Sequence, residues 1–514
     1  LSADEEDEEL SLQYRNNQSF AIGHGCAAGW EHSLTTDGGS PPWVETCFLP
    51  RAEIKPVTTV LEERSFPEEI LSLQYLQDSS KPKEDILKGL EKFVNDYDSW
   101  FQDIGQENLP DEFEAAAQRI LQRIAGTIGR MREGIAILRE ENTAYEIFQL
   151  SNRAMLIQMI HAGEEYAGTP RLANAVKFMR PDYGDQQRFS TAFRWHPFQL
   201  GFFLLSLKGL WEPESDDRKL VDLIWFPTGG GKTEAYFLVA SFEILRRRIL
   251  EGARGSGTSV IKRYTLRLLT TQQFQRSAGL ICALEYLRRA DPERLGEDEI
   301  SIGLWIGEDT PYSFVDAQKQ YLDLVNAVDI TNPFPLQVCP VCGTEIVPTG
   351  TFEGDEGLGI HSTETSFRFF CPSSSCDFND RLPVQVVDEV LYRDPPTLLI
   401  GTIDKFARLA WDARSRSFFG GEEHLPPTLV IQDELHLISG TLGTVAGVYE
   451  AAIDAAIRFQ KYGRIPKILA ATATIRRAGE QVERLYGRPV SIFPPPGIDS
   501  DDSFEDLKDL VFTY

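Results

Sequence analysis

A glycine-rich segment of the chain has the residue types that bind a nucleoside triphosphate. The segment FPTGGGKTE, residues 226–234, lies between the apolar runs LVDLIW and AYFLVASFEIL. Glycines let the backbone curl so that several N–H groups point at phosphates, and the N-terminus of a following helix favours the same anion. A lysine can reach the β and γ phosphates, and a threonine hydroxyl can bind Mg²⁺. The sequence therefore predicts an ATP site formed by Thr228, Gly229, Gly230, Gly231, Lys232 and Thr233.

A second segment, TLVIQDELH at residues 428–436, is a β-prone run that ends in two acidic residues. In a parallel α/β sheet, ligands bind at the carboxyl ends of the strands, so these carboxylates are expected to face the phosphate loop. We expect Asp433 to hold Mg²⁺ and Glu434 to orient and deprotonate the attacking water. His436 is a third candidate catalytic residue, with a packing or capping histidine as the alternative.

Together with looser segments elsewhere, these two segments resemble the first motor lobe of superfamily 2 helicases of the DEAH/DExH kind. The further segments are HPFQ at 196–199, YTLRLLTTQQFQR at 264–276, GTIDKF at 401–406 and ATAT at 471–474. Phe226 stands where the strict phosphate-loop pattern has its first glycine, and the helicase variant of the loop commonly lacks that glycine too. The resemblance covers roughly residues 194–494.

The resemblance implies roles for residues in these segments. Gln199 would read the donor and acceptor atoms of adenine. Thr472 and Thr474 would connect the ATP site to the surface that grips a nucleic-acid strand. A lone Phe-Gln pair is also an ordinary core residue followed by an amide, so a purely structural Gln199 is the alternative. The residues implied to hold nucleic-acid phosphates are Arg267, Gln272, Arg276, Thr402 and Lys405.

The same resemblance implies an α/β fold, a RecA-like P-loop NTPase lobe whose parallel sheet is flanked by helices. We expect this lobe over residues 191–496, with residues 497–514 beginning a linker to a second lobe. Residues 1–65 look irregular and β-prone. In residues 66–190 apolar positions recur at helical spacing, which is typical of a helical domain. The expected architecture is a mixed and helical N-terminal part followed by the α/β lobe.

Four of the seven cysteines form two closely spaced pairs, CPVC and CPSSSC. Two such pairs are typical of a structural zinc site, and the 28 residues between them suffice for a small β-ribbon. Reduced buried thiols are the alternative, since disulfides are not expected in a cytoplasmic ATPase. We predict an inserted ribbon at about residues 330–388 that binds Zn²⁺. Its ligands would be Cys339, Cys342, Cys371 and Cys376.

The net charge of −27 argues against a protein that coats nucleic acid over its whole surface. A local groove stays possible, because arginines and lysines concentrate within residues 246–289. The alternative is that arginines such as those at 246–248, 288 and 289 lie along amphipathic helices with their charged ends in water. Arg267 and Arg276 are the stronger candidates because they flank the polar TTQQ segment.

No apolar stretch reaches the length that a membrane span requires. The longest, FQLGFFLLSL at residues 198–207, is far short of the ~20 residues that a bilayer needs. The chain starts at Leu1 with an acidic run instead of the basic and apolar regions of a secretory signal. We therefore expect a cytoplasmic protein without membrane contact, and a natural chain that is longer than this one.

A more particular resemblance appears when further segments are included. They are SFAIGHGCAAGW at 19–30, RWHPFQLGF at 194–202, PTGGGKTEAY at 227–236 and QDELHLISGTLGT at 432–444, together with the cysteine ribbon. This combination resembles the large helicase subunit of the DISARM anti-phage defence system. The resemblance implies ATP-dependent engagement of phage DNA, together with a second core subunit and a DNA methyltransferase of that system.

Three interpretations of function remain. The first is an ATP-dependent DNA helicase or translocase. The second is a module in which ATP only locks a DNA-binding or scaffolding conformation, and the third is an RNA-directed superfamily 2 helicase, because backbone contacts are largely blind to base identity. Arginines from a second lobe can be worth about 10³ to 10⁵ in rate. No second-lobe sequence follows residue 474, so we expect this piece alone to hydrolyse ATP slowly.

Overall fold

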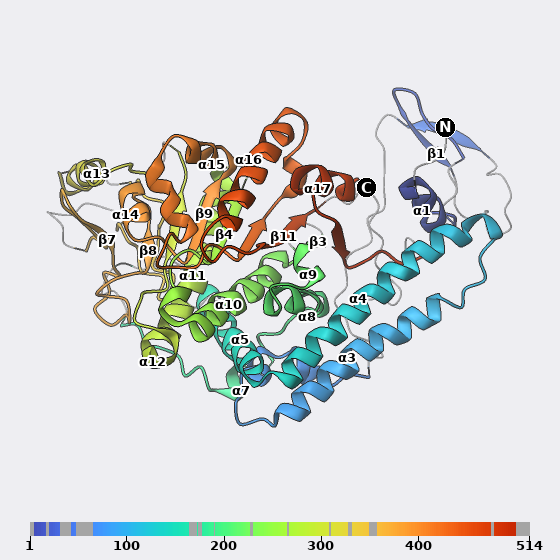
Figure 1. Ribbon diagram of the computed structural model, residues 1–514, viewed down its shortest axis with the longest axis horizontal. Helices are drawn as coiled ribbons and strands as arrows, with labels where there is room; N and C mark the ends of the chain where they lie inside the picture. The colour runs from blue at the N-terminus through green and yellow to red at the C-terminus, as the bar shows by residue number, and fades with distance from the viewer. Residues whose placement is uncertain are drawn as a thin grey trace. The chain divides into compact units, whose positions relative to one another are not determined.

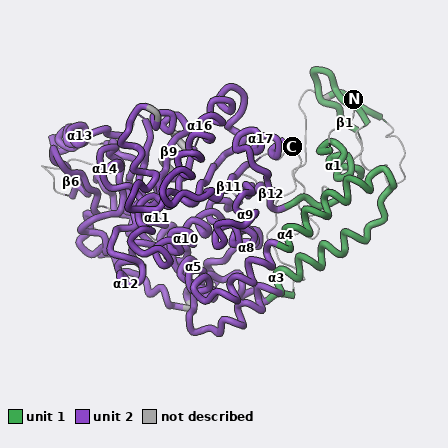
Figure 2. The backbone as a smooth tube through the Cα atoms, viewed as in Figure 1, with its two compact units in different colours: residues 1–66, 92–129, 495–514 green, residues 67–91, 130–494 purple. Residues whose placement is uncertain are grey.

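The chain divides into two compact units (Figure 2). The computed structural model describes residues 5–16, 20–30, 43–47, 65–163, 172, 177–189, 191–226, 230–264, 267–307, 310–326, 331–348, 357–473 and 477–499, without the side chains of residues 186, 187, 267–272 and 410. Unit 1 comprises Leu1–Phe66, Lys92–Gly129 and Pro495–Tyr514, and unit 2 comprises Pro67–Glu91 and Arg130–Pro494. All the candidate site residues therefore belong to unit 2.

Unit 2 is built around a parallel β-sheet (Figure 1). Within the described residues the sheet has eight strands, in the spatial order β12-β3-β11-β10-β4-β9-β5-β8, and every pair of neighbours is parallel. This order places the end of β3, which leads into the phosphate loop, two strands away from the end of β10. The strands are β3 (Val221–Trp225), β4 (Val260–Tyr264), β5 (Ile302–Trp305), β8 (Val384–Gln385), β9 (Leu398–Thr402), β10 (Leu429–Gln432), β11 (Lys467–Thr472) and β12 (Val490–Phe493).

Helices cover both faces of this sheet (Figure 1). On one side lie α8 (Pro197–Trp211), α10 (Lys232–Glu251) and α11 (Arg267–Ala290), with α5 (Asn142–Ala162) packed against α10 and α11. On the other side, apolar residues of α16 (Gly440–Arg458) and α17 (Ala478–Tyr486) join strand residues such as Val430 and Ile468 in one buried cluster. Because both faces are covered, the central strands are apolar almost throughout, as parallel sheets require. The predicted RecA-like α/β lobe is confirmed.

The predicted ribbon is an insertion between strands of this lobe. Its two short strands, β6 (Ile360–Ser362) and β7 (Phe367–Phe369), are antiparallel and lie in the chain between β5 and β8. The helix α13 (Phe314–Asn326) precedes them in the chain and contacts both strands. Shorter helices of unit 2 are α2 (Leu73–Leu76), α7 (Gln186–Phe189), α9 (Asp216–Lys219), α12 (Pro292–Leu295), α14 (Asp388–Arg393) and α15 (Ile403–Phe406).

The N-terminal part is mixed and helical, as predicted. Its described elements are α1 (Glu5–Gln13), the antiparallel strands β1 (Ala27–Trp30) and β2 (Val44–Cys47), and the long helices α3 (Lys83–Ile104) and α4 (Glu114–Glu140). The residues of α4 that recur at helical spacing, including Ile120 and Ile124, are buried. Since residues 92–129 belong to unit 1, the division between units passes through α3 and α4. The domain boundaries predicted at residues 65 and 190 stay predictions. Among the helices that the structure describes, none combines the length and apolar character needed to cross a bilayer.

Candidate nucleotide and metal sites

The predicted phosphate loop lies between β3 and α10. The helix begins at Lys232, directly after Gly231. Gly231 has a φ of +87°, a left-handed backbone conformation that glycine adopts without strain. Gly230 is described, whereas Thr228 and Gly229 lie outside the described residues. The glycine that starts the helix is therefore at a position where its conformational freedom is needed.

Gln199 connects the start of α8 to this loop. Its Nε2 donates a hydrogen bond to the carbonyl of Gly231 over 2.8 Å, and its Oε1 accepts one from the N–H of His196, also over 2.8 Å. The side chain is buried, so both polar groups of the amide are satisfied inside the protein. A Cβ atom on Gly231 would lie 2.6 Å from Gln199 Nε2, so a larger residue would displace this amide. The contact of Gln199 with adenine stays a prediction.

Lys232 is buried at the first position of α10. Its Nζ donates a hydrogen bond to the carbonyl of Phe226 over 2.5 Å. Burial lowers the pKa of the ammonium group, and the negative charges of Glu434 and Asp433 oppose that decrease. The lysine therefore shares one electrostatic environment with the two predicted catalytic carboxylates.

The hydroxyl of Tyr236 links the two predicted magnesium ligands. Tyr236 lies one turn after Thr233 on α10, and its Oη is 3.1 Å from Thr233 Oγ1 and 2.5 Å from Asp433 Oδ2. The other carboxylate oxygen of Asp433, Oδ1, accepts a hydrogen bond from the N–H of Glu434 over 3.0 Å. The fold thus brings a hydroxyl and a carboxylate from distant parts of the chain to one place. Both are oxygen ligands of the kind that Mg²⁺ prefers.

Glu434 has a backbone conformation that is uncommon for a residue with a side chain. Its φ and ψ are both 49°, in the left-handed region, immediately before the 3₁₀ turn η7 (Leu435–Leu437). Strain of this kind occurs at functional sites, where the surrounding structure holds it in place. Burial, followed by the charge of Asp433, raises the pKa of the Glu434 carboxyl, while Lys232 and His436 oppose the increase. A carboxylate with a raised pKa accepts a proton from water more readily.

His436 lies between Glu434 and the end of β11. Its Nδ1 is 3.5 Å from Glu434 Oε2, a contact that is an ion pair only when the imidazole is protonated. The same nitrogen is 3.4 Å from the Oγ1 of Thr472. These contacts form a path from the carboxylate to the predicted coupling motif. Thr474 lies outside the described residues.

The four predicted zinc ligands come together in the inserted ribbon. The sulfur atoms of Cys339, Cys342, Cys371 and Cys376 all lie within 4.8 Å of one another, and all four residues are buried. Cys339 and Cys376 are 3.9 Å apart at sulfur, and Cys342 and Cys371 are 3.3 Å apart. Four thiolates in a tetrahedron around Zn²⁺, each ~2.3 Å from the ion, are separated by about 3.8 Å. The cluster therefore fits a Cys₄ zinc site, and zinc binding stays a prediction.

Comparison with known proteins gives an extended similarity in sequence. No family model matches the chain. In an alignment 543 positions long, the chain is 34% identical to the DISARM protein DrmA of Bacillus paralicheniformis (strain ATCC 9945a / NCIMB 11709 / CD-2). The alignment covers 96% of this chain. The predicted resemblance to DrmA is confirmed. It covers 47% of the DrmA protein, so the chain spans about half the length of the curated relative it matches.

Two solved helicase structures show a weaker likeness to this chain. The DUF1998 helicase MrfA bound to DNA and AMPPNP is 16% identical with a TM-score of 0.35, covering 66% of this chain and 34% of that one. The Mycobacterium smegmatis helicase Lhr bound to ssDNA and AMP-PNP is 17% identical with a TM-score of 0.31, covering 58% and 27%. Likeness at this level supports no argument about individual residues.

The arginines on α10 of this chain lie inside the protein. Arg246 pairs with Glu243 over 2.8 Å, and Arg247 has no exposed surface. Both interpretations offered for residues 246–248, a nucleic-acid groove and charged ends in water, are therefore wrong. The physical reason is that a guanidinium group has five N–H donors, which here satisfy backbone carbonyls between elements. Arg247 donates to the carbonyls of Gly255, Ser256, Thr258, Leu425 and Pro426.

Three of the predicted nucleic-acid contacts lie on α11. The side chains of Arg267 and Gln272 are outside the described residues. Arg276 is described, and its guanidinium forms a short ion pair with Glu234, the residue that follows the phosphate-loop threonine. The Arg276 side chain is 42% exposed, so it remains accessible beside the nucleotide site. Its contact with a nucleic-acid strand stays a prediction.

The other two predicted contacts, Thr402 and Lys405, lie at the end of β9 and in α15. Both are buried. The Nζ of Lys405 forms an ion pair with Asp388 over 2.8 Å and lies 4.5 Å from the ring centroid of Tyr312. Lys405 is therefore held by contacts inside the protein. The phosphate contacts of both residues stay predictions, and a strand could reach them only if their surroundings moved.

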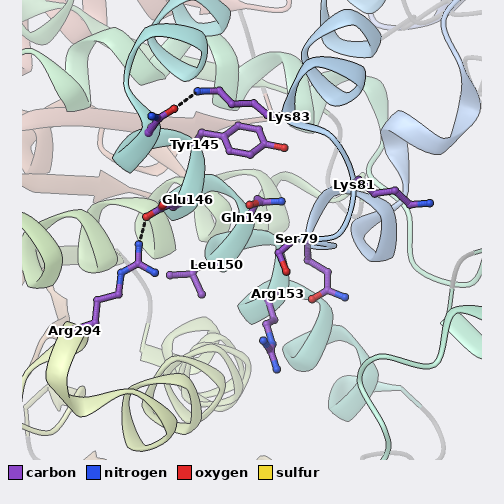
Figure 3. A pocket seen from close by; sticks show the side chains of 11 residues that line it. Ser79, Lys81, Lys83, Tyr145, Glu146, Gln149, Leu150, Arg153 and Arg294 are labelled. Carbon is purple, nitrogen blue, oxygen red and sulfur yellow. Dashed lines mark hydrogen bonds and ion pairs between the residues drawn. The ribbon is translucent and has the colours of Figure 1, made fainter.

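A pocket of about 570 Å³ lies away from all of these residues (Figure 3). Its wall includes four basic side chains and one acidic one, Glu146, which forms a short ion pair with Arg294. Lys83 is held by a 2.8 Å hydrogen bond to Asn142 Oδ1. None of the predicted site residues lines this pocket, so its volume is no measure of the nucleotide site. It is lined by Gln77, Ser79, Lys81, Lys83, Asn142, Tyr145, Glu146, Gln149, Leu150, Arg153 and Arg294.

Two residues of the nucleotide site were missed in the sequence. Tyr236 lies three residues after Thr233, a spacing that places both on one side of a helix, but within an apolar run a tyrosine indicates core packing. Lys262 counted only as one of many basic residues. Its actual position, in the middle of β4 and fully buried, depends on which helix covers that strand.

Proposed function

We propose that this chain carries the nucleotide-binding lobe of an ATP-dependent DNA helicase or translocase that works in anti-phage defence. The observation that carries the proposal is the hydroxyl of Tyr236, which touches both Thr233 and Asp433. A phosphate-loop hydroxyl and a strand-end carboxylate held at one point are what a shared Mg²⁺ requires. The relationship to the DISARM protein DrmA supports the defence role.

The residues of the site suit the binding of ATP with Mg²⁺. Lys232 would hold the β and γ phosphates, exchanging its hydrogen bond with the loop carbonyl of Phe226 for one with phosphate oxygen. Backbone N–H groups at the start of α10 would face the same anion. Thr233 and Asp433 would hold the Mg²⁺, which when bound neutralises charge on the phosphates.

Hydrolysis needs a group that takes a proton from the attacking water, and we propose Glu434 for this role. Its raised pKa and its position next to Asp433 suit a general base. His436 connects it to Thr472 at the end of β11. We propose that this contact path carries the state of the nucleotide to the strand-gripping surface.

The Glu434→Gln variant tests the enzymatic proposal. Because the amide cannot take the proton, we expect DNA-stimulated ATP hydrolysis to fall by about 10² to 10⁴ while ATP binding persists. The matched control is Glu423→Gln, which alters an exposed glutamate of the same unit and should leave both unchanged. Wild-type protein that binds ATP without hydrolysing it would instead favour the module in which ATP only locks a conformation.

The class of nucleic acid is tested with the same assay. We expect stimulation of ATP hydrolysis by single-stranded DNA or by duplex with a single-stranded end. Stimulation by RNA alone would replace the proposal with an RNA-directed helicase. We further propose that the chain binds a second core subunit of the same defence system, which co-purification of the two proteins would test.

For the ribbon, we propose that the four clustered cysteines bind Zn²⁺ as a structural ion. We expect one zinc per chain by elemental analysis, with loss of that zinc in Cys371→Ser. The matched control is Cys282→Ser, which removes a buried thiol of α11 outside the cluster and should retain the metal. Full-length folded protein without zinc would favour reduced thiols instead.

A further inference from the structure

The starting observation is a tyrosine hydroxyl that bridges two elements of the nucleotide site. Tyr236 belongs to α10, whereas Asp433 follows β10, and the side chain of Tyr236 is only 1% exposed. Its Oη is 2.5 Å from Asp433 Oδ2 and 3.1 Å from Thr233 Oγ1. A phenylalanine would fill the same apolar volume, so packing alone gives no reason for the hydroxyl.

The hydrogens of these groups can be assigned by counting donors. A tyrosine hydroxyl has one hydrogen, and an ionised carboxylate has none. The shorter contact, to a charged acceptor, takes the Tyr236 hydrogen. The contact with Thr233 is then a hydrogen bond only if the threonine donates to Tyr236 Oη. In this arrangement the lone pairs of Thr233 Oγ1 stay available for a cation.

Burial and the charge of Asp433 keep Tyr236 in its protonated form. Both raise the pKa of the phenol well above its usual value of 10.0. The hydroxyl is therefore the donor in its contact with Asp433. Asp433 keeps one oxygen on Tyr236 and the other on the N–H of Glu434.

Lys262 holds the ring of Tyr236 from behind. It lies on β4, directly opposite Ile431 of β10, and its side chain is fully buried. Its Nζ is 4.5 Å from the ring centroid of Tyr236, 4.8 Å from that of Phe237 and 5.0 Å from that of Tyr264. Among the described residues its Nζ has no hydrogen-bond acceptor. The ammonium is thus held by aromatic faces, which attract a cation.

We propose that Tyr236 is a positioning residue that fixes Thr233 and Asp433 at the separation needed to share one Mg²⁺, with Lys262 holding its ring in place. The inference rests on the proposed function, because it concerns the same nucleotide site. It assigns to one hydroxyl the coupling between the phosphate-loop helix and the strand that carries the acidic pair. Removing the hydroxyl leaves Asp433 with one fewer donor and takes away the contact of Thr233 with Tyr236.

The test is Tyr236→Phe, measured as the affinity for a non-hydrolysable ATP analogue with and without Mg²⁺. In wild type we expect Mg²⁺ to tighten binding. In the variant we expect the Mg²⁺ concentration for half-maximal tightening to rise roughly ten-fold, the effect of losing one hydrogen bond to a charged group. Binding in excess EDTA should be unchanged, because the hydroxyl does not touch the phosphates in this arrangement.

The matched control is Tyr145→Phe, which deletes another buried tyrosine hydroxyl of unit 2, one that has no hydrogen-bond partner among the described residues. It should leave the Mg²⁺ dependence unchanged. Lys262→Met tests the ring cage, and we expect a shift in the same direction as in Tyr236→Phe but smaller. A Lys262→Met variant with wild-type Mg²⁺ dependence would remove the lysine from the proposal.

The outcomes separate the two proposals. If wild type shows Mg²⁺-dependent tightening and folded Tyr236→Phe shows the same dependence, the positioning role is wrong and the proposed function stands. If wild type binds the nucleotide with no effect of Mg²⁺, or does not bind it, the proposed function is wrong and the inference falls with it. The expected shift, without loss of binding in EDTA, would support both.

Discussion

The amino ends and the carboxyl ends of the strands form two edges of the central sheet, the amino edge and the carboxyl edge. These two edges hold buried charge in different ways. At the amino edge, Asp222 of β3 is bound by Arg130 over 2.9 Å and by Lys467 over 2.8 Å. The Nζ of Lys467 also donates to the backbone carbonyls of Asp217 and Leu220. Each of these buried ions is thus paired with opposite charge, and the lysine has further acceptors.

At the carboxyl edge the groups are less completely satisfied. Glu434 has a left-handed backbone, and Lys232 donates to a loop carbonyl. Nearby, Lys262 rests against three aromatic rings without an acceptor among the described residues. Buried polar groups in native proteins are normally hydrogen-bonded, so such exceptions call for an explanation.

This difference distinguishes the edge of the sheet that stabilises the fold from the edge that is suited to bind a ligand. Fully paired charges at the amino edge fix one arrangement of strands and helices. The strained backbone of Glu434 at the carboxyl edge and the buried charge of nearby Lys262 come at a cost in stability that the rest of the fold must offset. Replacing the buried Asp222 should therefore destabilise the protein, whereas replacing the buried Lys262 should stabilise it.

The largest effect is expected for Asp222→Ala at the amino edge. The change leaves Lys467 buried without an opposite charge and Arg130 paired with Asp217 alone, which costs about 3 to 5 kcal/mol of unfolding free energy. Urea denaturation followed by circular dichroism would measure it. As a control, Asp216→Ala alters a carboxylate whose side chain is 92% exposed and should change stability by less than about 0.5 kcal/mol.

Lys262→Met, a substitution in the middle of β4, should act in the other direction. Replacing a buried ion by an apolar side chain of similar length should stabilise the protein by about 1 to 4 kcal/mol. It should do so while weakening the response to Mg²⁺. A destabilised Lys262→Met protein would show that the ring cage fully compensates for the burial of the ammonium, and the contrast between the edges would fail.

Lys262 also predicts a pH dependence of stability. Burial lowers its pKa from 10.5 to about 7, so between these values the unfolded chain binds one more proton than the folded protein. Stability from this group therefore rises as the pH increases from about 7 to 10.5. The groups around it that carry or share charge are Asp433, Arg276, Glu234, Tyr236 and Tyr264. Thermal unfolding of wild type and Lys262→Met would be measured over this pH range. We expect stability to increase more steeply with pH in wild type than in Lys262→Met.

The smallest effect is expected for Gly231→Ala in the phosphate loop. In the variant, the positive φ and the close approach of Gln199 Nε2 should raise the free energy of the loop conformation that binds ATP by about 1 to 3 kcal/mol. This increase would weaken ATP binding by roughly ten-fold or more. Gly252→Ala is the matched control at the other end of α10, with φ +58° but no atom within 4 Å of the added methyl group. It should lower stability and leave nucleotide affinity unchanged. Equal nucleotide affinities for the two variants would contradict the close contact.

Much of the fold and part of the site followed from short segments of sequence. A glycine-rich segment between apolar runs, a second apolar run ending in Asp433 and Glu434, and the family resemblance that these segments carry predicted a parallel α/β lobe with both segments at its ligand edge. Cysteine spacing was enough to predict the cluster. These predictions succeeded because the relevant geometry, a turn, a strand end or a knuckle, is set by a few adjacent residues.

Other features did not follow, because they depend on contacts between distant segments. The basic residues 246–248 have the composition of a nucleic-acid surface, yet carbonyls from residues 425 and 426 take up the donors of Arg247. The ion pair of Lys405 with Asp388 was likewise not predicted. In each case the partner lies on an element whose position the local sequence does not specify.

By itself the sequence determined which chemical groups the protein has for binding a nucleotide and a metal, and which segments of chain carry them. Only the tertiary structure decided that Tyr236 joins Thr233 to Asp433, that Lys262 lies behind that tyrosine, and that the amino edge is closed by ion pairs. The physical reason is strand order. Residues about 200 positions apart meet only because β3, β11, β10 and β4 are neighbours in one sheet, and local spacing does not encode that order.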